Sequence, residues 1–158
     1  MNKVVKSRAP LRLGFAGGGT DVSPYSETFG GCVLNATIDR YAYSVIEGLP
    51  DKFMEISAPD IDEFYQISCS DAMNSSDKGS LTLNIYQYFM ENHNCGKAIP
   101  LKITAFCDAP PGSGLGSSST LVVAIIQCFV DFFNLTWDEY KIAEVAYYIE
   151  RIRCGLDG

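Results

Sequence analysis

The sequence predicts an α+β domain, and two observations carry that prediction. Segments with the alternation typical of strands come first in the chain, and segments with helical periodicity dominate its second half. The chain has 158 residues with no internal repeat or low-complexity linker, which suits one domain with a sizeable core. Strands in bulk followed by helices favour layers of sheet and helix packed on each other.

The strand candidates lie mainly in the first half of the chain. Residues 4–15 have an extended pattern, and Pro10 indicates an edge strand or a bend there. Residues 32–47 alternate in character and predict one strand, or two with a break near Asp39 and Arg40. Shorter strands are predicted at 53–58, 64–68 and 100–108.

Four helices are predicted, each from a different signal. A short helix is expected at 24–28, with Asp21 as its N-cap and glycines 30–31 at its end. Residues 81–92 have one apolar face, and residues 117–133 are apolar nearly all round, as in a buried helix.

The fourth helix is expected to begin at a capping box, Thr136-x-x-Glu139. Its predicted buried face consists of Ile142, Val145, Ile149 and Ile152. The polar residues 71–79, which follow the strand candidates, are predicted to be loop.

Composition and charge exclude several classes of partner. The net charge of −7 argues against a nucleic-acid-binding surface. No stretch reaches the ~18 apolar residues of a membrane span. Residues 1–6 lack the apolar segment and cleavage site of a secretion signal. We therefore expect a cytoplasmic protein without a nucleic-acid or membrane partner, and the oligomeric state stays open.

Cysteine and histidine usage narrows the chemistry further. The six cysteines lie far apart without a C-x-x-C pair, so we expect small core residues rather than disulfides or metal ligands. A Ser-His-Asp or Cys-His hydrolase would have to use the single histidine, His93. That residue sits between Asn92 and Asn94 in what reads as a polar helix end, which disfavours a hydrolase.

The most informative segment is 110–120, PPGSGLGSSST, which is followed at once by an apolar run. Gly112, Gly114 and Gly116 remove Cβ atoms where the backbone must approach something closely. A glycine loop that opens a helix presents free N–H groups and the positive end of the helix dipole to an anion. A nucleotide phosphate is the expected anion, and the alternative is a flexible Gly/Ser turn before a buried helix.

Two other phosphate-binding loops are excluded. A Walker A loop ends in Gly-Lys-Ser/Thr, and no lysine lies between Lys102 and Lys141. The glycine spacing also differs from the G-x-G-x-x-G dinucleotide fingerprint. Phosphate charge must therefore be met by backbone N–H groups, a metal ion and basic side chains from elsewhere, and the serine hydroxyls are candidate magnesium ligands.

Three segments resemble the GHMP kinase superfamily, which includes galactokinase, homoserine kinase and mevalonate kinase. Residues 110–119 are similar to its second motif, and residues 9–21, APLRLGFAGGGTD, are similar to the first motif of its sugar 1-kinases. The GGGTD form together with Ser119 most resembles the D-glycero-D-manno-heptose 7-phosphate kinase branch. Residues 150–158 resemble the helix and loop that lead to the family's catalytic aspartate.

The resemblance implies a two-layer α/β sandwich, akin to ribosomal-protein domain 2, with an unusual left-handed βαβ crossover. It implies that residues 1–158 are the N-terminal ATP-binding domain of a longer kinase whose C-terminal domain is absent here. We expect this fragment alone to be inactive.

The implied reaction is ATP- and Mg²⁺-dependent phosphorylation of a small sugar phosphate. The branch points to the anomeric hydroxyl of D-glycero-D-manno-heptose 7-phosphate, in nucleotide-heptose biosynthesis. The alternatives are a fucose or galactose kinase, and a non-catalytic GHMP-like binding module.

The resemblance assigns the nucleotide phosphates to the second motif. The assigned residues are Pro111, Gly112, Ser113, Gly114, Leu115, Gly116, Ser117, Ser118 and Ser119. Ser118 matches the family's magnesium-binding serine and Glu150 its acidic partner, which leaves most metal positions for water and phosphate oxygens. The plain alternatives are that Ser117 and Ser118 only cap the helix and that Glu150 is a solvated surface residue.

The first motif is assigned to the sugar. Asp21 matches the sugar-binding aspartate, because a carboxylate accepts two hydroxyl hydrogens with charge assistance. The neighbouring Gly17, Gly18, Gly19 and Thr20 would let the sugar approach the backbone. Arg12 matches an arginine near the reacting hydroxyl, where a fixed cation stabilises charge during transfer; its alternative is a strand-surface cation.

Two assignments stay open. Lys6, Arg8 and Arg40 are candidates for a second phosphate on the substrate, without a basis for choosing among them. The catalytic base is expected a few residues past Gly158 rather than at Asp157.

Overall fold

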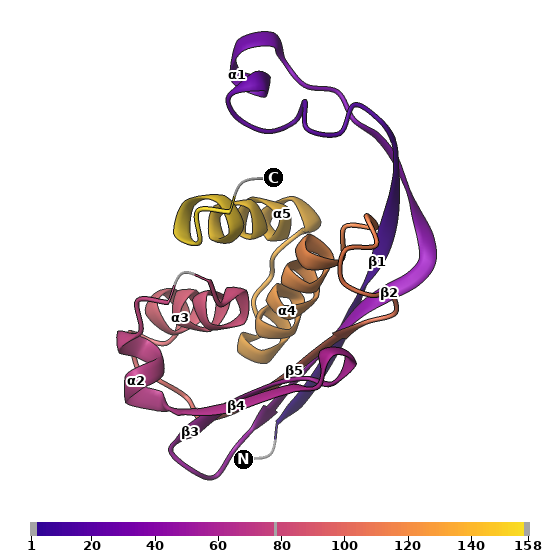
Figure 1. Cartoon of the computed structure of the whole chain (residues 1–158). Coiled ribbons are helices and arrows are strands. Elements are labelled where there is room, and N and C mark those ends of the chain that lie inside the picture. The colour runs from indigo at the N-terminus through magenta and orange to yellow at the C-terminus, as the bar shows by residue number, and fades with distance from the viewer. Residues whose placement is uncertain (1–2, 78, 157–158) are drawn as a thin grey trace.

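The computed structural model describes residues 3–77 and 79–156, which form a sheet with helices packed on one of its faces (Figure 1). The strands are β1 (Val4–Ala16), β2 (Leu34–Gly48), β3 (Phe53–Ala58), β4 (Glu63–Ser68) and β5 (Leu101–Cys107). The helices are α1 (Tyr25–Phe29), α2 (Cys69–Asn74), α3 (Leu81–His93), α4 (Ser117–Phe133) and α5 (Glu139–Tyr147), with a 3₁₀ turn η1 (Pro59–Ile61) and a π-helical turn η2 (Tyr148–Arg153). The α+β prediction is confirmed.

The five strands run in the order β1-β2-β5-β3-β4. All neighbouring pairs are antiparallel except β3 and β5, which are parallel. A parallel pair needs a crossover connection, and here it runs through β4, α2 and α3. This is the place where the expected left-handed crossover would lie, and its handedness stays a prediction.

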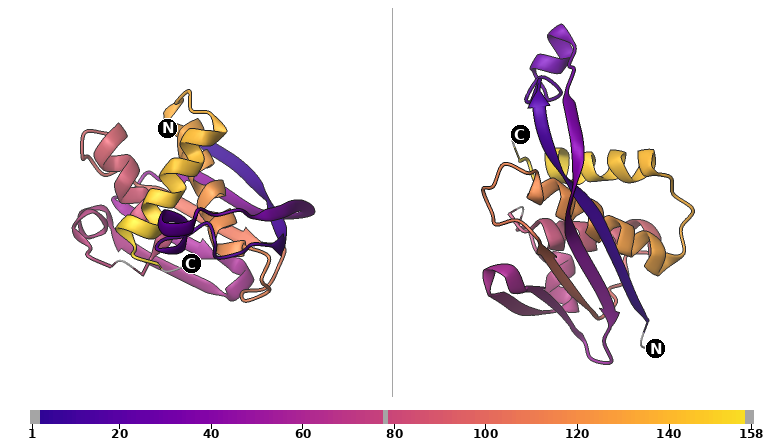
Figure 2. Two further views of the ribbon diagram at one scale, coloured as in Figure 1. Left: turned by 90° about the horizontal axis from the view of Figure 1, so that it is seen from above. Right: turned by 90° about the vertical axis from the view of Figure 1, so that its right-hand side faces the viewer.

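The first two strands form a long arm that extends past the rest of the sheet and carries α1 at its tip (Figures 1 and 2). Their pairing changes register between Pro10 and Arg12, as predicted for a bend at the proline. β2 is one continuous strand, and its pairing with β1 is interrupted between Thr37 and Tyr41, where the sequence predicted a break.

The core lies between the sheet and helices α3, α4 and α5. Helix α4 packs against β1 and β2 and is buried on most of its surface, as its apolar sequence predicted. Phe89 of α3 stacks on Phe129 of α4 with ring centroids 4.7 Å apart. Such aromatic pairs add about 0.5–1.5 kcal/mol beyond their area burial, and this one joins the helix that follows the glycine loop to the rest of the domain.

Two local predictions in the first half are wrong. Residues 71–74, predicted to be loop, belong to α2, because the Ser68 hydroxyl accepts the Asp71 N–H at 3.1 Å and Ala72 is fully buried. Asp21 does not cap α1, since the N-cap is Pro24, without a side-chain capping bond. The predicted glycine end of α1 is confirmed at Gly30.

The start and the end of the last helix also differ from prediction. The N-cap of α5 is Asp138, whose carboxylate accepts the Lys141 N–H at 2.8 Å, so Thr136 does not form a capping box. Ile142, Val145 and Ile149 are buried as predicted, whereas Ile152 is 63% exposed. Its position falls in the π-helical turn, which alters the rotation per residue and takes Ile152 out of the buried stripe.

The cap of α5 gives a stability prediction. Asp138→Ala should lower the free energy of unfolding by about 1 kcal/mol, because the first-turn N–H loses its acceptor. Thr136→Ala, a change in the same connection, should stay within about 0.5 kcal/mol of the parent. Urea unfolding of the 158-residue chain measures both. If Thr136→Ala destabilised the chain more than Asp138→Ala, the predicted capping box would be supported instead.

The burial of the cysteines and the surroundings of the histidine differ from those expected. All six cysteines are free, but only Cys128 and Cys154 are buried, while Cys32 and Cys95 are exposed. His93 packs among the rings of Phe89, Phe133 and Trp137 rather than in a polar setting, and burial lowers its pKa. Within the described residues, no helix combines the length and apolarity needed to cross a membrane.

Candidate functional site

The glycine loop between β5 and α4 adopts left-handed backbone conformations that its glycines permit. Gly112, Gly114 and Gly116 have φ angles of 77°, 74° and 72°, a region that residues with a Cβ rarely adopt. Gly116 is the N-cap of α4 and makes no side-chain capping bond. The first bond of the helix runs from the Thr120 N–H to the Gly116 carbonyl at 3.1 Å. The Ser117 and Ser118 hydroxyls therefore do not cap α4, which removes the plain alternative for them.

Arg12 brings the first motif against the second. Its backbone N–H donates to the Leu115 carbonyl at 3.2 Å, so the loop lies along β1. A Cβ added at Gly116 would lie 3.1 Å from Nη1 and 3.2 Å from Cζ of Arg12. Within residues 3–77 and 79–156, no carboxylate forms an ion pair with Arg12. An uncompensated cation thus lies beside the N-terminus of α4.

Glu150 reaches the same helix terminus from the end of the chain. Its Oε1 accepts the Ser119 hydroxyl at 3.0 Å, and the pair is partly buried. The carboxylate predicted to act with Ser118 therefore contacts the adjacent serine, while Ser118 is exposed. Glu150 is half-buried and hydrogen-bonded, so it is not a freely solvated surface residue.

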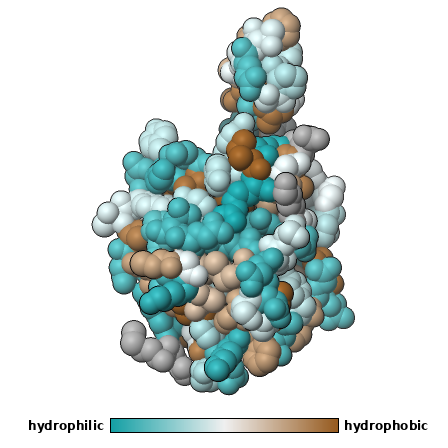
Figure 3. Space-filling view, turned by 90° about the vertical axis from the view of Figure 1, so that its left-hand side faces the viewer, coloured by the Kyte–Doolittle hydropathy of each residue, from teal (hydrophilic) through white to brown (hydrophobic). Residues whose placement is uncertain are grey.

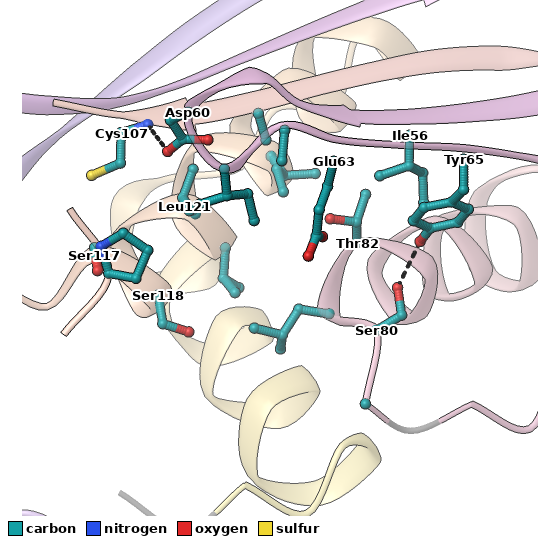
Figure 4. Close-up of a pocket in the computed structure, with 18 of the residues that line it drawn as sticks. Ile56, Asp60, Glu63, Tyr65, Ser80, Thr82, Cys107, Ser117, Ser118 and Leu121 are labelled. Atoms are coloured by element: carbon teal, nitrogen blue, oxygen red, sulfur yellow. Dashed lines mark hydrogen bonds between the residues drawn. The ribbon is translucent and has the colours of Figure 1, made fainter. Parts of the chain in front are cut away.

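A pocket of about 370 Å³ opens beside the loop (Figure 4). Apolar side chains from β3, β5 and α4 form much of its lining, including Ile56, Ala105, Leu121, Val122 and Ile125. Ser117 and Ser118 lie at one end of it, so the pocket and the N-terminus of α4 are continuous.

Polar groups from the β3–β4 hairpin and α3 complete the pocket. The Asp60 carboxylate accepts the Cys107 N–H at 2.9 Å, which ties η1 to the end of β5. The Tyr65 hydroxyl bonds Ser80 at 2.9 Å, and burial raises the pKa of Tyr65, which keeps the phenol neutral. Figure 4 shows the Glu63 carboxylate directed into the pocket.

The sugar-assigned residues lie elsewhere, at the tip of the arm, which stands clear of the body in Figure 3. The Thr20 hydroxyl donates to the Gly17 carbonyl at 2.7 Å and accepts the Cys32 N–H at 3.1 Å, which closes the tip. A Cβ at Gly17 would lie 1.9 Å from the Cys32 carbonyl oxygen, so this glycine serves the packing of the tip itself. Asp21 follows on the exposed surface.

Arg8 is a further candidate, considered for a second phosphate on the substrate. Arg8 lies over the Tyr41 ring, with its Cζ 4.5 Å from the ring centroid. Its neighbours Ala9 and Ala42 face the core, so Arg8 faces the side of the sheet away from the helices. Asp157 lies outside the described residues. In the described part of the chain, no group of three or more His, Cys, Asp or Glu side chains could hold a metal ion.

Sequence comparison identifies relatives for this arrangement. Residues 80–158 match the family of GHMP kinases N terminal domain. The chain is 36% identical over 156 residues to D-glycero-alpha-D-manno-heptose 7-phosphate kinase of Campylobacter jejuni, covering 99% of this chain and 46% of that protein. It is 26% identical over 157 residues to a galactokinase of Thermotoga petrophila, covering 96% of this chain and 41% of that protein.

A solved structure extends the likeness to three dimensions. The crystal structure of a D-glycero-D-manno-heptose 1-phosphate kinase from Bacteroides thetaiotaomicron superposes with a TM-score of 0.85 at 41% identity. The match covers 99% of this chain and 50% of that one, so the chain spans about half the length of the relatives it matches. Because the family model covers half of the chain and the fold matches as well, the chain belongs to the family of GHMP kinase N-terminal domains.

Proposed function

We propose that residues 1–158 are the N-terminal, ATP-binding half of a full-length kinase that phosphorylates a sugar hydroxyl. The observation that carries the proposal is the continuity between the apolar pocket and the uncapped N-terminus of α4. The pocket has the size and apolar lining suited to a nucleoside. The N–H groups of the first turn of α4 suit its phosphates.

The residues at this terminus also fit a magnesium ion. Hydroxyl and carboxylate oxygens are ligands that Mg²⁺ prefers, and it keeps its other positions for water and phosphate. Ser118 and Glu150 would hold the ion, with Ser119 orienting the carboxylate through its 3.0 Å bond. A bound Mg²⁺ would neutralise charge on the transferred phosphoryl group.

The side chains of this chain then supply binding and alignment. Arg12 stabilises charge that develops between donor and acceptor, since its guanidinium lies beside Gly116. Asp21 holds sugar hydroxyls at the tip of the arm. In the full-length protein, the bound sugar must lie across a cleft from the phosphate loop so that the phosphoryl group can reach it. The gain comes from proximity and electrostatics rather than covalent chemistry.

The substrate we propose is D-glycero-D-manno-heptose 7-phosphate, phosphorylated on its anomeric hydroxyl, as a step in nucleotide-heptose biosynthesis. The similarity to heptose phosphate kinases in two comparisons supports it over a galactose or fucose kinase, because the galactokinase match is weaker at 26% identity. The six free cysteines suit a reducing compartment such as the cytoplasm.

A substrate panel tests the proposal. The full-length protein should consume ATP with the phosphorylated heptose and Mg²⁺, and should be slower with galactose and fucose. Turnover of a free hexose without use of the heptose phosphate would refute the substrate assignment. Absence of any transfer, with nucleotide bound in the pocket, would favour a binding module. In this proposal the 158-residue chain, which spans about half the length of its relatives, should show no turnover by itself.

A further inference from the structure

The last described turn of the chain is π-helical, and this shape decides where its side chains point. The Cys154 N–H donates to the Ile149 carbonyl at 2.9 Å, which is the i→i+5 bond of a π turn. Ile149 and Cys154 are both buried, whereas Ile152 is exposed. The turn is thus anchored in the core at its two ends. Single π turns are frequent at functional sites.

Arg153 ties this turn to helix α3. Its guanidinium donates to both Glu91 carboxylate oxygens, at 2.8 and 3.1 Å, and to the Gln87 side-chain oxygen at 3.4 Å. A bidentate pair of this kind fixes geometry as well as adding energy. Gln87 is 5% exposed and is itself held, because its amide donates to the carbonyls of Ala72 and Ser75 at 2.7 and 2.9 Å. The partners of Arg153 therefore include a rigid, buried residue.

Glu150 projects from the same turn toward α4, where it accepts the Ser119 hydroxyl. Its backbone is held on one side by buried Ile149 and on the other by Arg153. The Leu156 N–H donates to the Glu150 carbonyl at 3.0 Å, which adds a restraint from the chain beyond. A rotation of the turn would move the Glu150 carboxylate away from the first turn of α4.

We propose that Arg153, acting through Glu91 and Gln87, is a positioning residue that holds Glu150 at the N-terminus of α4. The inference rests on the proposed function, because it takes the Glu150 carboxylate to serve the metal–nucleotide complex. Partners that orient a metal ligand typically matter about 10–100-fold for metal affinity. Arg153 would act in this way from the opposite side of the turn, without touching the metal or substrate.

The first test measures the turn directly. In the 158-residue chain, Arg153→Ala should speed amide hydrogen exchange in residues 148–156 at least tenfold, while exchange in β5 and the body of α4 stays unchanged. Lys141→Ala is the matched control, because it removes an exposed ion pair to Glu144 within α5. Equal exchange in Arg153→Ala and in the parent would overturn the clamp.

The second test measures the metal. In the full-length protein with a non-hydrolysable ATP analogue, Arg153→Ala should weaken Mn²⁺ binding about 10-fold, with Lys141→Ala unchanged. Arg153→Lys should recover part of the lost Mn²⁺ affinity, because it keeps a cation beside Glu91. The double variant Arg153→Glu with Glu91→Arg should recover more than Arg153→Lys, because it restores a bidentate ion pair between the two positions. These variants also guard against a general folding defect.

The outcomes separate this inference from the proposed function. If Glu150→Gln weakens Mn²⁺ binding but Arg153→Ala does not, Arg153 has no positioning role and the proposed metal role stands. If Glu150→Gln leaves Mn²⁺ binding unchanged, the metal role of Glu150 fails, and the positioning role fails with it.

Discussion

In the proposed reaction, Ser118→Ala should lower turnover of the full-length protein at least about 100-fold, which corresponds to about 2.7 kcal/mol of transition-state stabilisation. Ser118 is exposed at the N-terminus of α4 and lines the nucleotide-sized pocket, so its hydroxyl is available to a bound metal. The proposed phosphoryl transfer depends on charge neutralisation and alignment, and loss of Ser118 as a proposed metal ligand would disturb both. Steady-state kinetics at saturating ATP and Mg²⁺ measure the effect on kcat.

Ser119→Ala is the informative companion, because the two serines are adjacent but differently engaged. The Ser119 hydroxyl donates to Glu150. Ser119→Ala should therefore leave both proposed metal ligands, Ser118 and Glu150, in place and reduce turnover less than Ser118→Ala. Ser76→Ala, an exposed serine outside the site, should match the parent. An unchanged rate for Ser118→Ala together with a large loss for Ser119→Ala would transfer the ligand role to Ser119.

Secondary-structure elements whose ends are decided by residues close in sequence could be predicted from the sequence. Helix α4 begins and ends where its apolar run predicted, because Gly116 and Asn134 both adopt left-handed conformations at its ends. The glycine loop is similar, since glycine readily adopts the positive φ angles that Gly112, Gly114 and Gly116 have. Both motifs could therefore be located before their surroundings were known.

The errors arise where distant contacts decide local structure. The π turn at the chain end is held by Arg153 and Glu91, which lie 62 residues apart, so helical periodicity through Ile152 could not reveal it. Likewise Ser119, rather than Ser118, meets Glu150 because the turn of η2 fixes the approach of the carboxylate. A motif match identifies both serines and cannot rank their contacts.

The pocket lay beyond sequence reasoning for a related reason. The side chains of Asp60, Glu63 and Tyr65 come from a short hairpin without a recognisable motif. They join the site because η1 folds back onto β5, where Asp60 meets Cys107 across 47 residues. Glu63 and Tyr65 lie two residues apart on β4 and so share one face, but the sequence held no signal that the N-cap of α3, Ser80, would meet that face.

Gly17→Ala should open the tip of the arm, whereas Gly18→Ala should not. A Cβ at Gly17 would stand 1.9 Å from the Cys32 carbonyl oxygen, and φ is +78°, so the backbone must move. A left-handed residue with a Cβ costs about 1–2 kcal/mol before any clash. At Gly18, a Cβ meets nothing within 4 Å and φ lies outside the left-handed region.

Hydrogen exchange on the 158-residue chain distinguishes these two variants. In Gly17→Ala, the amides of Thr20 and Cys32 should exchange at least about tenfold faster, the equivalent of ~1.4 kcal/mol, because their partners at Gly17 and Thr20 are displaced. The core should keep its protection, since the tip stands apart from it. Exchange as slow as in the parent would mean that the Cys32 carbonyl moves aside at little cost. Gly17 would then not be needed for packing of the tip, and its proposed role in sugar binding would remain. If the tip does open, the backbone that positions Asp21 is lost. With the proposed role of Asp21 in sugar binding, sugar affinity of the full-length protein should then fall without a change in nucleotide affinity.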